Sequence, residues 1–214
     1  MPLVRRDADD NLPGEERREN QRDRAGLLEQ LQDPRPAARR RAAREIAGDA
    51  TAMDAICNAL EIETDAGSRH AMLTALLVTG GERATARLLQ LLRSEDAGLR
   101  NGAIEVLQGM PGLAGEYMDG LLSDPDSDVR IFAVNILESL RHQRVPEWLQ
   151  QVLQNDDHVN VCAAAVDVLT EAGGPECLPA LEALPQRFPD EPFVDFAVRT
   201  AVRRIQGPGG SHGQ

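Results

Sequence analysis

The 214-residue chain contains no lysine, so all 23 of its basic side chains are arginine. Aromatic residues make up only 3% of the sequence, whereas alanine and leucine are abundant. Small and unbranched side chains suit close packing between helices better than the surface of a β-sheet. The composition therefore favours an all-α fold.

Several patterns that carry chemistry are also missing. The three cysteines, Cys57, Cys162 and Cys177, form no Cys-x-x-Cys pair, which excludes a zinc site of that spacing and a disulfide framework. None of the four histidines is followed by glutamate, and there is no phosphate-binding or nucleophile motif. We therefore expect no catalytic residues, no metal ion and no cofactor.

Long apolar runs are absent too, and basic charge is scarce over most of the chain. The longest apolar stretch, around residues 71–78, is too short to span a bilayer, and no signal peptide precedes it. We expect a cytoplasmic protein without membrane contact. Residues 45–214 hold 12 arginines against 26 acids, which argues against nucleic acid as a partner. The acidic charge favours a basic protein partner, or serves solubility alone.

A sequence motif does recur about every 30 residues. Its clearest copy reads Leu121-Leu122, Asp124-Pro125-Asp126, Val129-Arg130, Ala133, Leu137. The arginine slot falls at Arg39, Arg69, Arg100, Arg130 and Asn160. A period of this size is typical of stacked helical hairpins, each too small to bury its own apolar face. We expect an α-α superhelix, a right-handed solenoid of about six helix pairs.

The domain organisation follows from where the pattern stops. Residues 1–19 mix charges with proline and glycine, so we expect them to be disordered or loosely attached. Residues 20–206 should form a single repeat domain, and residues 207–214 a flexible tail. Within the domain, Ser68 is expected to cap a helix, and Pro185 to break one.

This motif resembles the HEAT repeat, in particular the short bacterial variety called the PBS-lyase HEAT-like repeat. The resemblance covers roughly residues 24–206. The matching features are the apolar pair, the Asp-Pro turn and the Val-Arg-x-x-Ala-x-x-x-Leu helix. The resemblance implies an armadillo-like solenoid and a ladder in which a turn acid and an arginine six positions later link the units. The ladder residues it implies are Asp33, Arg39, Glu63, Arg69, Arg100, Asp124 and Arg130. Ser94 and the pair Gln154 and Asn160 depart from the pattern.

The resemblance also implies that the second helix of each pair lines a concave binding face. The residues expected on that face are Arg41, Arg44, Thr74, Glu105, Gln108, Phe132, Asn135 and Glu138. Phe132 is either a binding anchor or a side chain packed between units. The basic cluster of residues 35–44 either receives an acidic partner or a phosphate group, or is a solvated face.

Two functions remain open. The first is a non-catalytic scaffold or adaptor that binds a protein partner, possibly basic, on the concave face. The second, which rests on the resemblance alone, is a lyase-type or maturation subunit acting on a chromophore- or cofactor-bearing protein.

Overall fold

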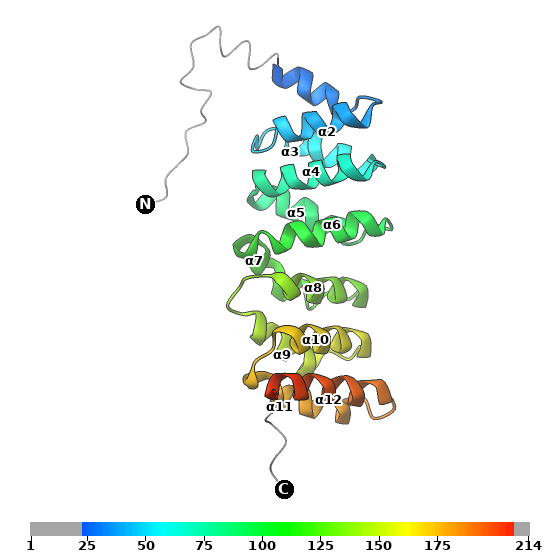
Figure 1. Cartoon of the computed structure of the whole chain (residues 1–214), viewed down its shortest axis with the longest axis vertical. Helices are drawn as coiled ribbons and strands as arrows, with labels where there is room; N and C mark the ends of the chain where they lie inside the picture. Colours follow the sequence, from blue (N-terminus) through cyan, green and yellow to red (C-terminus); the bar gives the residue numbers. More distant parts are fainter. Residues whose placement is uncertain (1–22, 208–214) are drawn as a thin grey trace, which may run out of the picture. The chain divides into compact units, whose positions relative to one another are not determined.

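The computed structural model describes residues 23–207, and every regular element in this range is a helix (Figure 1). The chain divides into two compact units, the first ending at Gly80 and the second beginning at Gly81. The helices form two pairs in the first unit and four pairs in the second. The predicted all-α fold of helix-pair repeats is therefore confirmed. The single domain predicted for residues 20–206 stays a prediction, and residues 1–19 and most of the tail lie outside the described range.

The first unit consists of a helix at residues 23–30, followed by α2, α3 and α4. Their bounds are Pro36–Glu45, Met53–Ile62 and Ala66–Thr79. Helix α4 packs against both α2 and α3, and its buried face includes Met72 and Leu76. Gly80 ends α4 with a φ of 63°, a left-handed conformation that glycine adopts without strain.

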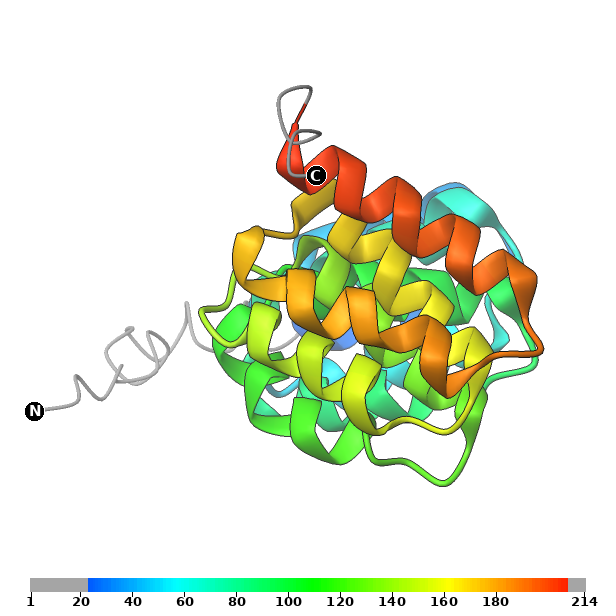
Figure 2. The ribbon, with the colours of Figure 1, turned by 90° about the horizontal axis from the view of Figure 1, so that it is seen from below.

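The second unit contains four helix pairs in two layers. The first helices of the pairs are α5 Gly81–Leu91, α7 Pro111–Leu121, α9 Val145–Asn155 and α11 Leu178–Arg187. The second helices are α6 Ala97–Gln108, α8 Ser127–Ser139, α10 Val159–Ala172 and α12 Pro192–Gln206. Helices α6, α8, α10 and α12 pack side by side in that order, while α5 lies against α7 and α9 against α11 (Figure 2).

The core of the second unit lies between these layers. Each helix buries an apolar stripe, for example Ala133, Ile136 and Leu137 of α8, all at most 1% exposed. The single tryptophan, Trp148 on α9, is completely buried. Among residues 23–207 no helix is long and apolar enough to cross a membrane.

Two local expectations are wrong. Helix α4 is capped by Asp65, whose carboxylate accepts from the Ser68 N–H at 2.8 Å, so Ser68 lies inside the helix rather than at its cap. Asp96 and Asp126 cap α6 and α8 in the same way. Pro185 does not end its helix either, because α11 continues to Arg187.

Candidate functional site: the ladder and the acidic groove

An arginine at the start of a second helix joins two consecutive repeats. In the first unit, Arg39 Nη1 donates to the carbonyl oxygen of Asp33 at 2.8 Å, within its own repeat. Its Nε and Nη2 donate to the carboxylate of Glu63, in the next repeat, at 2.6 and 2.7 Å. Glu63 is only 4% exposed, and the Arg39 guanidinium holds the pKa of this carboxyl below its usual range. We call such a pair of contacts a rung.

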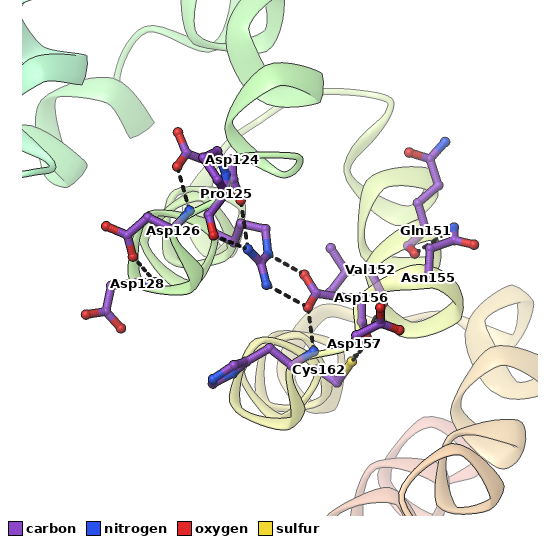
Figure 3. A network of polar contacts seen from close by, with 12 residues as sticks. Asp124, Pro125, Asp126, Asp128, Gln151, Val152, Asn155, Asp156, Asp157 and Cys162 are labelled. Atoms are coloured by element: carbon purple, nitrogen blue, oxygen red, sulfur yellow. Dashed lines mark hydrogen bonds and ion pairs between the residues drawn. The ribbon is translucent and has the colours of Figure 1, made fainter.

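The second unit repeats this geometry around Arg130 (Figure 3). Arg130 Nη1 donates to the carbonyl oxygen of Asp124 at 2.7 Å, and Nε and Nη2 donate to the carboxylate of Asp156 at 2.7 and 3.1 Å. The turn residue six positions before the arginine thus contributes its main chain. The carboxylate comes from the turn of the following repeat.

Other ladder residues make related contacts. Arg69 and Arg100 donate to the carbonyl oxygens of Glu63 and Ser94, both at 2.7 Å. The Arg100 guanidinium also lies 5.3 Å from the centre of the Phe132 ring. The Asp124 carboxylate accepts from Arg93. The Asp33 carboxylate accepts from the backbone and side chain of Arg35, which lower its pKa to about 2.

The fifth arginine slot is Cys162, and not Asn160 as the regular period predicted. Cys162 Sγ lies 3.3 Å from the carbonyl oxygen of Asp156, again six positions earlier. Arg187 of α11 supplies the missing guanidinium: its Nη1 and Nη2 donate to the carbonyl oxygens of Leu153 and Asp156 at 2.6 and 2.9 Å. Burial raises the pKa of the Cys162 thiol to about 11, so it is protonated at neutral pH.

A groove of about 500 Å³ lies beside the Arg130 rung, between the end of α7 and helix α9. We call it the acidic groove. Its lining residues are Asp119, Leu122, Ser123, Asp124, Pro125, Arg130, Trp148, Gln151, Val152, Asn155, Asp156 and Asp157. The lining holds four carboxylates and one guanidinium. Each carboxylate has an arginine partner: Asp119 pairs with Arg144, Asp124 with Arg93, Asp156 with Arg130 and Asp157 with Arg187. The side chain of Asp157 is the most exposed of the four.

The wall at Asp119 is held by a network of aromatic and basic side chains. Arg144 donates to both carboxylate oxygens of Asp119 at 2.9 and 3.0 Å, and Trp148 Nε1 donates to Oδ1 at 2.8 Å. Arg144 and Trp148 together lower the pKa of Asp119, so it stays ionised at neutral pH. The Trp148 ring is stacked against His142, with centroids 4.8 Å apart. These contacts fix the wall on α7 and α9.

Other residues of the lining offer polar groups to solvent. The side chain of Asp157 is fully exposed, and its nearest cation is Arg187 at 3.6 Å. Gln151 and Asn155 are also exposed along α9. Carboxylate and amide oxygens at the mouth of a groove can accept hydrogen bonds from an ammonium or guanidinium group. This site could not be seen in the sequence pattern, because its residues come from two turns one repeat apart.

The residues predicted for the concave face lie on the second helices as expected, with unequal exposure. The exposed ones are Arg41, Arg44, Thr74, Glu105 and Glu138, and the half-buried ones are Gln108, Phe132 and Asn135. Gln108 Nε2 donates to the carbonyl oxygen of Asn135 at 2.9 Å, which ties α6 to α8. Phe132 packs under Arg100, also between α6 and α8. The role of this face in binding stays a prediction.

The basic cluster at the start of the first unit is largely neutralised. Arg35, Arg39 and Arg41 form ion pairs with Asp33, Glu63 and Glu45. These pairs leave less free positive charge than the sequence suggests.

Comparison with known proteins places the chain among repeat proteins. It is 32% identical over 126 residues to the bilin biosynthesis protein PecE of Mastigocladus laminosus. That match covers 58% of this chain and 46% of PecE, so the chain spans about half the length of this relative.

Two solved structures are similar at low identity. One is a designed armadillo repeat protein in complex with the peptide (KR)4, at 16% identity, a TM-score of 0.42, and 84% and 98% of the two chains covered. The other is the complex of CpcE and CpcF of phycocyanin lyase from Nostoc sp. PCC7120, at 18% identity, a TM-score of 0.37, and coverage of 96% and 98%.

The family model for HEAT repeats matches residues 24–108 and 117–202. These two ranges contain most of the chain and include the Arg39 and Arg130 rungs. The chain therefore belongs to the HEAT repeat family.

Proposed function

We propose that this protein is a non-catalytic interaction module, a scaffold or adaptor, that binds a basic segment of one protein partner in the acidic groove. The observation that carries the proposal is the lining of the groove, which holds four carboxylates and one guanidinium and includes the fully exposed side chain of Asp157. A lysine or arginine side chain entering the groove would meet the exposed Asp157 and the amides of Gln151 and Asn155.

The chemistry of the groove supports a cation rather than an apolar ligand. Trp148 and Val152, which help to line it, are at most 4% exposed, so polar groups contribute the larger share of its accessible surface. Charge-assisted hydrogen bonds from a guanidinium are short and directional. Because the groove is open to solvent, its attraction for a basic segment should weaken as salt is added.

The predicted face on the second helices is the rival surface for the same partner. In the second unit it carries exposed Glu105 and Glu138, and Asp167 of α10 is exposed as well. A basic segment that runs across α6, α8 and α10 would use these acids instead of the groove. The two surfaces can be separated by mutation because they share no residue.

The test is fluorescence anisotropy with a labelled octa-arginine peptide, with an octa-glutamate peptide as the charge control. We expect Asn155→Arg combined with Asp157→Arg to raise the dissociation constant for octa-arginine at least about tenfold, equal to about 1.4 kcal/mol. Glu105→Arg combined with Glu138→Gln changes the charge by the same three units on the rival surface and should have the smaller effect. The reverse order would reject the groove and favour the second-helix face.

A second candidate is a lyase-type or maturation subunit acting on a chromophore- or cofactor-bearing protein. The similarity to PecE, a bilin biosynthesis protein, favours it. This candidate predicts pigment absorbance in the protein purified from a host that makes bilins and the acceptor protein. A colourless preparation that leaves the acceptor unmodified would count against it.

A further inference from the structure

The outer side of α12 carries apolar side chains that no described element covers. Helix α12 buries Val194, Val198 and Ala201 against α10 and α11. Phe193 and Phe196 are 45% and 69% exposed. At about 100° per residue, Phe196 lies on the side of the helix opposite the buried stripe. Figure 1 shows α12 at the end of the row formed with α8 and α10.

Two exposed phenylalanines on one helix face are unusual in this molecule. The chain has only four phenylalanines, and the helix faces of repeat proteins that are not covered by another repeat are expected to be polar. Exposed aromatic side chains grouped in this way mark surfaces that associate with another protein. The exposed face of α12 is therefore suited to association with another protein surface.

The charges along α12 indicate what that other surface is. Its first half and the turn before it hold the acids Asp190, Glu191 and Asp195, and its second half holds Arg199, Arg203 and Arg204. Arg203 is exposed and forms no ion pair with any residue in the range 23–207. The sequence of charges also suits the helix dipole. If a second α12 helix runs antiparallel to the first, its arginine half faces the acidic half of the first helix, and the opposite charges attract.

We propose that a second copy of this chain docks on α12, with the two α12 helices antiparallel across a two-fold axis. Such an isologous contact brings the arginine half of each helix against the acidic half of the other. Phe193 and Phe196 of both copies are buried at its centre, and Arg203 gains the acidic partners that it lacks among residues 23–207 of its own chain. A partner of acidic and apolar character from another protein would be a different occupant, which the experiment below separates.

The test is sedimentation equilibrium of the full chain over a micromolar concentration series. We expect a mass that rises from the monomer value of 23.3 kDa toward twice that value. Phe196→Glu should raise the dissociation constant of the dimer at least about tenfold, because it places a charge in the apolar centre. Arg203→Glu should raise it less, and added salt should reduce the difference between Arg203→Glu and the wild type.

The matched control is Ile62→Glu, which introduces the same charge at another exposed apolar side chain, 70% exposed, and should leave the dimer unchanged. Circular dichroism of each variant checks that the helices are intact. A monomer at every concentration would overturn the proposal, as would a dimer that Phe196→Glu does not weaken. The groove variants Asn155→Arg and Asp157→Arg should not alter the mass, so failure here is distinct from failure of the proposed function.

Discussion

Glu63 shows how much depends on a single side chain in a rung. Its carboxylate is buried and accepts from Nε and Nη2 of Arg39, so removing its charge leaves the guanidinium without its paired carboxylate. We expect Glu63→Gln to lower the free energy of unfolding at pH 7 by about 1–3 kcal/mol. Urea denaturation followed by circular dichroism measures this, with the exposed Glu29→Gln as control.

Glu63 should also make the free energy of unfolding depend on pH. Arg39 lowers the pKa of Glu63 in the folded state from its ordinary value of 4.5, so its contribution is complete above pH 4.5. The contribution is lost as the pH falls through the folded-state pKa, because the unfolded chain then binds the proton more tightly. The difference in the free energy of unfolding between the wild type and Glu63→Gln should therefore become smaller as the pH falls below 4.5. A difference that stays constant down to the acid transition would contradict the ion pair.

Cys162 supplies a prediction about reactivity. Burial raises the pKa of its thiol to about 11 and that of Cys177 above its usual range, and Cys57 is 5% exposed. Thiolates and not thiols react with disulfide reagents. We expect all three cysteines to react slowly at pH 8 in the native protein and rapidly in denaturant. Fast labelling of one cysteine in the native protein would show that its helix is less well packed than described.

The spacing of six residues within one repeat relates an arginine to its own turn but not to a carboxylate. Arg39 and Arg130 donate to the carbonyl oxygen of the residue six positions earlier, because the first turn of the helix fixes that distance. Which carboxylate they bind depends on the following repeat, which the spacing within one repeat does not specify. The ladder as a whole stays a prediction. The fifth slot was misplaced because the step there is 32 residues, and a cysteine with a distant arginine replaces the expected residue.

At the scale of elements, α8 is where the packing can be tested most directly. Ala133 lies completely buried between neighbouring helices, so Ala133→Leu should destabilise by about 1–3 kcal/mol through overpacking. Leu137 is 1% exposed, so Leu137→Ala should destabilise by about 2–5 kcal/mol by leaving a cavity. Trp148, the only tryptophan, reports urea unfolding of this unit by fluorescence.

The exposed neighbour Glu138→Ala is the control for both α8 variants and should change stability by less than about 0.5 kcal/mol. Variants at 133 and 137 that unfold like the wild type would mean that the buried face of α8 is wrongly assigned.

Helices were easier to predict than their ends. The apolar period locates every pair because each helix must bury one stripe. The ends depend on single hydrogen bonds, and two of them were misplaced. Ser68 has the side chain of a cap, but Asp65, three residues earlier, caps the helix by accepting from the Ser68 N–H. Pro185 lies two residues before the end of α11, near the helix end.

At the scale of the whole molecule, the net charge of −12 is an average over surfaces with different roles. The sequence shows the acidic excess but not where it gathers. The acidic groove forms because Asp119 and Asp124 come from one repeat and Asp156 and Asp157 from the next. A repeat spacing of about 30 residues between acids is the signal that could have found it.

The most direct test of the acidic groove is site-specific photocrosslinking in the native host. A photoreactive amino acid replaces Asn155 at the groove or, in a parallel strain, Glu138 on the second-helix face. We predict an adduct from position 155 with one protein, attached at a segment rich in lysine and arginine, and little or none from position 138. Adducts only from position 138, or adducts from position 155 to an acidic segment, would contradict the account.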